Sequence, residues 1–238
     1  MKRKYILHAE PGQFKITGSS TRGILGATYT GRSIDVEGGY AEAKKWLENY
    51  EASQEKNPEL EQKLLENLVP VAGAIYNETL FRGLFFITSP KSAEDFGPPP
   101  LHLAKRGRYN REGVQVLYLC SSAKGVMREL GMPLAGQKLW IQRFRLLPHM
   151  QLADARELPM DSLAAAVFWL IESGRDRASQ PPHLGERVGQ ILSVKYDGLI
   201  VPGVRGEPNE LYHNVVIFHP RDRWIELLDS NAYPEEAP

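Results

Sequence analysis

The chain has 238 residues, 42% of them hydrophobic, and its 29 basic and 29 acidic residues give a formal net charge of zero. This length suits one medium-sized domain, or one domain with an extension. Charge balance argues against non-specific nucleic-acid binding, which needs excess lysine and arginine to neutralise phosphates. The single cysteine, Cys120, excludes an internal disulfide and fits a reducing compartment. No apolar run approaches the roughly 20 residues that cross a bilayer, so we expect a cytoplasmic protein with no membrane or nucleic-acid partner.

The N-terminal third predicts a hairpin followed by helices. Residues 5–7 and 14–16 could pair as two strands across a Pro-Gly turn. Residues 40–53 carry apolar side chains at helical spacing. A second helix is expected to begin at Asn57-Pro58, where asparagine suits the cap and proline the first position. We therefore expect a partly helical N-terminal extension over residues 1–75.

After residue 79 the pattern changes to short strands and loops. Residues 80–86 and 116–119 are expected as strands, the latter followed by a helix that Ser121 or Ser122 caps. Residues 138–146 alternate apolar and polar side chains, which is typical of a half-buried strand. Further expected elements are a helix from Asp161 to Gly174, a short helix over 186–193, and strands over 199–201 and 215–218. The sequence predicts an α+β fold, with a main domain over 76–225 and a C-terminal tail over 226–238.

Arg82 is the first candidate functional residue, because it stands in the middle of an otherwise apolar strand. An arginine there is costly unless an anion meets it. It is expected either to pair with a buried carboxylate or to line an anion site. Glu129 is the candidate carboxylate, as a structural partner or as a catalytic group.

A basic loop surrounds Gly107 and Tyr109. Two interpretations stay open: a solvated basic loop, or a cradle for a phosphate or pyrophosphate with Tyr109 available to stack on a ring. The basic residues are Lys105, Arg106, Arg108 and Arg111.

The sequence offers little support for metal or thiol chemistry. None of the six histidines is paired with another at helical spacing, and one cysteine cannot build a thiolate cage, so we expect no metal. Cys120 suits a buried structural thiol better than a nucleophile.

Several segments, taken in order, resemble the RES domain over roughly residues 79–219. They are Phe81-Arg82, Gly107-Arg108-Tyr109-Asn110, residues 117–122, Arg128-Glu129, residues 196–202 and residues 214–218. RES domains are named for an arginine, a glutamate and a serine. The resemblance implies an ADP-ribosyltransferase-like fold, in which short mixed or antiparallel strands are flanked by helices. It also implies an NAD-consuming toxin, with an antitoxin protein as partner.

Carried over by position, the resemblance implies that Arg82 and Glu129 are catalytic. The implied NAD-binding residues are Arg82, Arg108, Tyr109, Tyr118 and Gly203. Gly203 stands where the family serine is expected. Either the register differs there, or another side chain (Arg205, Asn209 or Asn214) substitutes for the hydroxyl, or the activity is changed or lost.

The expected function is cleavage of the nicotinamide–ribose bond of NAD by phosphorolysis or hydrolysis. NAD is then a substrate and not a resident cofactor. Such a site needs an anion clamp, an aromatic wall and a carboxylate near the ribose. Inorganic phosphate, water and a protein side chain all remain as acceptors. One alternative is a protein mono-ADP-ribosyltransferase that uses Glu207 or Glu210. The other is a catalytically inactive domain that binds NAD or a partner, which Gly203 suggests.

Overall fold

The computed structural model describes residues 6–10, 13–17, 34–35, 58–71, 74–156, 158, 162–172, 183–203, 212–220, 225–229 and 233–234. The chain divides into two compact units that interleave along the sequence. Unit 1 comprises Met1–Pro70, Gly107–Arg111 and Ala153–Lys195, and unit 2 comprises Val71–Arg106, Glu112–Leu152 and Tyr196–Pro238. The predicted division into an extension, a main domain and a tail stays a prediction.

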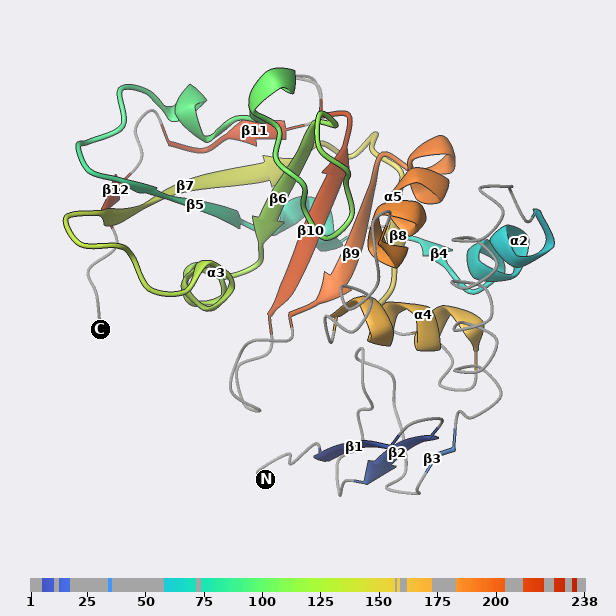
Figure 1. Ribbon diagram of the computed structural model, residues 1–238. Helices are drawn as coiled ribbons and strands as arrows, with labels where there is room; N and C mark the ends of the chain where they lie inside the picture. Colours follow the sequence, from blue (N-terminus) through green and yellow to red (C-terminus); the bar gives the residue numbers. More distant parts are fainter. Residues whose placement is uncertain are drawn as a thin grey trace. The chain divides into compact units, whose positions relative to one another are not determined.

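Unit 2 is built on an antiparallel sheet with the strand order β11-β7-β5-β6-β10-β9 (Figure 1). The short strand β12 also pairs with β7. The strands are β5 (Leu80–Phe86), β6 (Val116–Cys120), β7 (Lys138–Leu146), β9 (Gly198–Pro202), β10 (His213–Phe218), β11 (Ile225–Leu227) and β12 (Tyr233–Pro234). The helices are α3 (Ala123–Leu130) and the 3-10 helices η2 (Ala74–Asn77), η3 (Ala93–Phe96) and η4 (Leu101–Leu103).

The two faces of this sheet bury different side chains, because successive residues of a strand point to opposite sides. On β5, Leu80 and Leu84 pack into a large cluster with residues of η2 and η3. Phe81 and Phe85 lie on the other face, in a smaller cluster that includes Val126 of α3. We call these the η face and the α3 face. The distinction decides which candidate residues can meet.

Unit 1 contains the helices α2 (Pro58–Glu66), α4 (Leu163–Glu172) and α5 (Leu184–Lys195), in which α4 contacts both others. Strand β4 (Val69–Pro70) pairs with Ala153 and Asp154 of β8 (Leu152–Asp154). A separate small sheet has the order β1 (Ile6–Glu10), β2 (Gln13–Thr17), β3 (Ile34–Asp35). The buried side chains of the helices include Leu64, Val167, Phe168, Ile171, Leu184, Val188 and Leu192.

Most predicted elements are confirmed. The alternating stretch 138–146 is β7, the N-terminal hairpin pairs Leu7 with Ile16, and α2 begins at Pro58. The helix predicted over 186–193 is longer, because Leu184 is buried on the same side as Val188, one turn later. The helix predicted over 40–53 lies outside the described residues.

The sheet and its flanking helices confirm the α+β class. The ADP-ribosyltransferase-like arrangement stays a prediction. Among the described residues, no helix has the length and apolar character needed to span a membrane.

Candidate functional site

Glu129 accepts two side-chain hydrogen bonds in the last turn of α3. The Tyr212 hydroxyl donates to its Oε1 at 3.0 Å, and Asn214 Nδ2 donates to the same oxygen at 2.8 Å. Asn214 lies on β10 and Tyr212 immediately precedes that strand. Two hydrogen bonds to one carboxylate oxygen fix the orientation of the carboxylate. This part of the α3 face is the candidate site.

Helix α3 is held in place at its cap and by close packing on β5. The Ser122 side chain accepts a hydrogen bond from the Gly125 amide at 2.9 Å, as the predicted serine cap requires. Gly83 of β5 lies under Val126, and a side chain at position 83 would overlap the valine. The helix can therefore approach the sheet closely enough for Glu129 to reach β10.

Gly203 lies beneath the ring of Tyr212. The Gly203 amide donates to the Tyr212 carbonyl at 2.8 Å, which continues the pairing of β9 with β10. A Cβ at position 203 would overlap the tyrosine ring. The residue that stands in the place of the expected serine therefore contacts the residue that bonds Glu129.

Tyr118 lies on the same face of the sheet as this cluster. It is half-buried and lies two residues before Cys120 on β6, so the two side chains share a face. Cys120 pairs with Asn214 on β10. The predicted NAD-binding residues Tyr118 and Gly203 thus share the α3 face with Glu129. Arg205, Asn209, Glu207 and Glu210 lie outside the described residues.

Arg82 lies on the opposite face of the sheet. It lies two residues from both Leu80 and Leu84 along β5 and so shares their η face. Its guanidinium donates to the Gly97 carbonyl at 2.7 Å. Burial lowers the pKa of Arg82 to about 10. The hypothesis that Glu129 is the buried partner of Arg82 is wrong, because the sheet separates the two side chains.

Cys120 is buried on the α3 face. Burial is the main reason that the pKa of its thiol is raised to about 11, and the nearby Glu129 charge acts in the same direction. A thiol with so high a pKa is a poor nucleophile at neutral pH. The structure therefore agrees with a structural role for Cys120.

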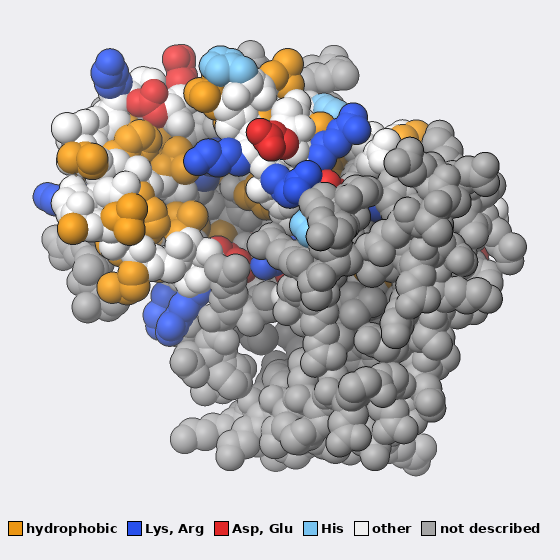
Figure 2. Space-filling view, in the orientation of Figure 1, with side chains coloured by type: hydrophobic (Ala, Val, Ile, Leu, Met, Phe, Trp, Pro, Cys, Tyr) orange, Lys and Arg blue, Asp and Glu red, His pale blue; other side chains and the backbone are white. Residues whose placement is uncertain are grey.

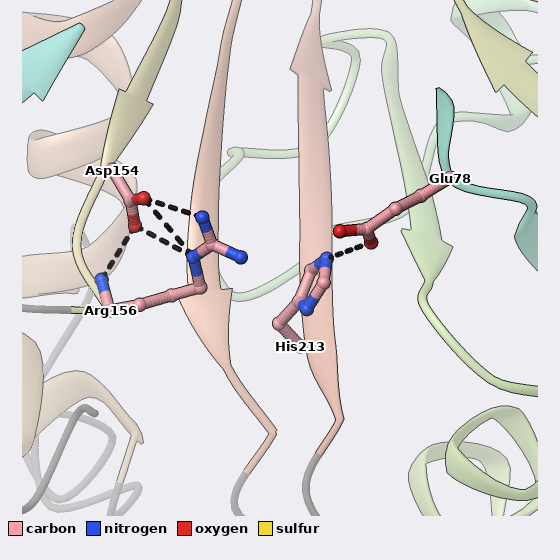
Figure 3. Close-up of polar contacts among 4 residues, drawn as sticks. All are labelled: Glu78, Asp154, Arg156 and His213. Atoms are coloured by element: carbon pink, nitrogen blue, oxygen red, sulfur yellow. Dashed lines mark hydrogen bonds and ion pairs between the residues drawn. The ribbon is translucent and has the colours of Figure 1, made fainter. Parts of the chain in front are cut away.

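A histidine–carboxylate contact lies at the start of β10, on the η face. His213 Nε2 is 3.1 Å from Glu78 Oε2 (Figure 3). The His213 amide also donates to Ser121 Oγ at 2.9 Å, and the Ser121 amide donates back to the His213 carbonyl. These contacts join β10 to the turn that precedes α3.

Arg108 and Tyr109 belong to unit 1, and both bind Glu172 of α4. Arg108 Nη1 donates to Glu172 Oε2 at 2.5 Å, and the Tyr109 hydroxyl donates to Glu172 Oε1. The Tyr109 side chain is 2% exposed and its ring contacts Phe168. Both residues therefore contact α4 within unit 1, and their role in NAD binding stays a prediction.

The other basic residues of the 105–111 loop lie at the surface. Lys105, Arg106 and Arg111 are exposed, and Figure 2 shows lysine and arginine side chains at the surface of the described residues. In unit 1, Arg156 Nη2 pairs with Asp154 Oδ2 at 2.7 Å (Figure 3). In the part of the chain that the structure describes, no three His, Cys, Asp or Glu side chains gather as metal ligands do.

Sequence reasoning named Asn214 only as one of three substitutes for a serine, and it missed Tyr212. The signal was present: Tyr212 and Asn214 are two apart just before the strand predicted over 215–218, so an extension of that strand would place both on the same side. Their distance from Glu129 in the sequence, more than 80 residues, hid the contact.

None of the curated proteins matches the chain. The family model of the RES domain matches residues 83–230, more than half of the chain. This match includes Glu129, Gly203, Tyr212 and Asn214, and it begins directly after Arg82. The chain belongs to the RES domain family.

Proposed function

We propose that this chain is an NAD-consuming enzyme that cleaves the nicotinamide–ribose bond, with Glu129 as its central carboxylate. RES domains are associated with NAD-related toxin–antitoxin systems. The observation that carries the proposal is the Glu129 carboxylate on the α3 face, which Tyr212 and Asn214 orient through the same oxygen. An oriented carboxylate in a matched family segment is the group that this chemistry needs.

The reaction develops positive charge on the ribose. As the bond between ribose C1′ and the nicotinamide nitrogen breaks, both bonding electrons leave with nicotinamide, which becomes neutral. The ribose then resembles an oxocarbenium ion, and a preorganised carboxylate stabilises that charge. The acceptor oxygen forms the new bond to C1′: water or a hydroxyl group then releases its proton to solvent, whereas phosphate attacks through an oxygen that already carries negative charge. Phosphate, water and a protein side chain can each supply that oxygen.

The other predicted residues divide between the two faces and the two units. Tyr118 and Gly203 share the face of Glu129, so we propose them as neighbours of the ribose and nicotinamide. The contacts of Arg108 and Tyr109 with Glu172 favour a structural role for both. A role for Arg82 in holding the pyrophosphate stays a prediction, tested separately below.

The test is incubation of the purified protein with NAD, with and without inorganic phosphate, followed by chromatography of the products. Nicotinamide release with a phosphate-dependent second product would identify a phosphorylase, and release without phosphate a hydrolase. Glu129→Gln keeps the size of the side chain and removes the charge, so turnover should fall by about 10²-fold or more. Equal turnover in this variant would exclude Glu129 as the central carboxylate.

A transferase that modifies a protein is the second candidate. Against it, Ser121 and Ser122 precede α3 instead of lying on a strand, and Ser122 is the helix cap. Label transferred from NAD to a protein would favour this candidate over free products. Binding of NAD without consumption, measured by calorimetry, would favour an inactive domain. An antitoxin protein is the partner that the family association supports.

A further inference from the structure

We infer that Tyr212, which immediately precedes β10, is the positioning residue of this site, and that it supplies the hydroxyl that Gly203, which immediately follows β9, lacks. The inference rests on the proposed function, because a positioning role has meaning only for a carboxylate that acts on a substrate. It assigns a role to a residue that the resemblance to the family did not point to.

The first step is the contact itself. Tyr212 is 7% exposed and packs into the cluster of the α3 face, so its ring has one place to lie. Its hydroxyl donates to Glu129 Oε1 at 3.0 Å. A hydrogen bond to a carboxylate from a rigid, buried ring restricts the carboxylate more than one from a mobile side chain.

The second step is the exclusion between positions 203 and 212. The tyrosine ring fills the space that any Cβ at position 203 would need. The Gly203 amide also bonds the Tyr212 carbonyl, so the two backbones cannot separate without loss of that hydrogen bond. A side chain at 203 and this ring therefore cannot coexist. Glycine at 203 is the condition for the tyrosine hydroxyl to reach Glu129.

The third step is the kind of effect to expect. Tyr212 contacts the Glu129 carboxylate and does not itself contact the reacting atoms in this proposal. It should therefore affect the orientation of Glu129 in the transition state. Loss of an interaction that matters mainly in the transition state lowers kcat and leaves KM nearly unchanged. A purely structural tyrosine would instead lower stability and leave kcat per folded molecule unchanged.

The experiment compares Tyr212→Phe with Tyr76→Phe. Tyr76 is also in unit 2, half-buried, and its hydroxyl donates to the Met150 carbonyl at 2.5 Å, so each variant loses a hydroxyl that donates a hydrogen bond. Tyr212→Phe should lower kcat for NAD by about 10-fold or more, with KM within about twofold, as loss of a bond to a charged group does. Tyr76→Phe should leave both constants unchanged. Equal effects of the two variants, or an unchanged kcat in Tyr212→Phe, would overturn the inference.

A second pair of variants tests the exclusion. Gly203→Ser alone should be strongly impaired, because its side chain meets the ring. Tyr212→Ala removes both ring and hydroxyl. The double variant Gly203→Ser/Tyr212→Ala should be more active than Tyr212→Ala, because the serine now has room and brings back a hydroxyl. A double variant no more active than Tyr212→Ala would overturn the exclusion.

A wild-type protein that does not consume NAD would overturn the proposed function. In that case the contact between Tyr212 and Glu129 is tested by protein stability instead of by activity. The free energies of unfolding of Tyr212→Phe, Glu129→Gln and their double variant form a thermodynamic cycle. A non-zero coupling would support the contact between the two side chains, and zero coupling would overturn it.

Discussion

Gly189 of α5 lies against the carbonyl oxygen of Tyr109, and a Cβ at position 189 would overlap that oxygen. Gly185, four residues earlier and so on the same side of the helix, meets the carbonyl oxygen of Arg108 in the same way. The two glycines form a groove in which the chain at 107–111 crosses the helix backbone to backbone. Both carbonyl groups lie in the segment Gly107–Arg111, which is part of unit 1.

Gly189→Ala should destabilise the protein by about 2–3 kcal/mol, although alanine is the better helix former. The backbone carbonyl of Tyr109 cannot move aside as a side-chain end could, so the loop must lift from α5. Urea unfolding followed by circular dichroism measures the change. Val194→Ala, on the same helix at a position that is 88% exposed, is the matched control and should change stability little. A Gly189→Ala variant as stable as wild type would contradict the packing.

Arg82→Met should leave the protein at least as stable as wild type near neutral pH. The pKa of Arg82 is lowered to about 10 because burial disfavours its charge, so the folded state holds this proton less tightly than the unfolded state. Wild-type stability therefore gains as pH rises above about 10, and any advantage of the variant should shrink there. Denaturation at about pH 8 and about pH 11 compares the two proteins.

The same variant also tests a functional role of Arg82. If Arg82 holds the pyrophosphate of NAD, Arg82→Met should raise the KM for NAD while the fold persists. An unchanged KM would show that Arg82 does not bind NAD. Arg82 lies on the η face, whereas Glu129 lies on the α3 face with the candidate site.

Asp229 should contribute stability at neutral pH that is lost in acid. Arg143 Nε donates to its carboxylate at 2.7 Å, and this hydrogen bond lowers the pKa of Asp229 below its ordinary 3.8. Because the folded-state pKa is depressed, the contribution is complete above the unfolded value and disappears as pH falls through the folded one.

Asp229→Asn should therefore be less stable than wild type near pH 7 and equal to it in strong acid. Guanidinium titrations at both pH values measure this. Glu226→Gln is the control, because its pair with Arg145 is long, at 3.4 Å, and exposed. A difference between Asp229→Asn and wild type that stays constant with pH would show that the charge is not the cause.

Cys120 should react slowly with thiol reagents in the folded protein. Its thiol is buried and its pKa is raised to about 11, so little thiolate exists at pH 8 and the reagent has no direct access. Modification by an aromatic disulfide reagent should become fast only when denaturant unfolds the chain. Fast modification under native conditions would show that the α3 face opens around this residue.

Local patterns predicted the elements of this chain well. Residues 138–146 formed the strand that their alternation predicted. Ser122 caps α3 by accepting a hydrogen bond from the amide of Gly125, three residues later. Both signals act within a few residues, so neither depends on the rest of the fold. The loop at 107–111 shows the opposite case. Its residue types suit solvent or phosphate equally, and Glu172, the residue that Arg108 contacts, lies more than 60 residues away.

By itself, the sequence determined the α+β class, most strand and helix positions, and the resemblance to the family that the comparison confirmed. Only the tertiary structure decided which residues meet. Arg82 and Glu129 lie on opposite faces of the sheet, and strand pairing brings Tyr212 over Gly203. No pattern among neighbouring residues predicts either relationship. The physical reason is that a side chain's partner depends on pairing between distant segments, whereas helix caps and strand alternation depend on neighbours along the chain.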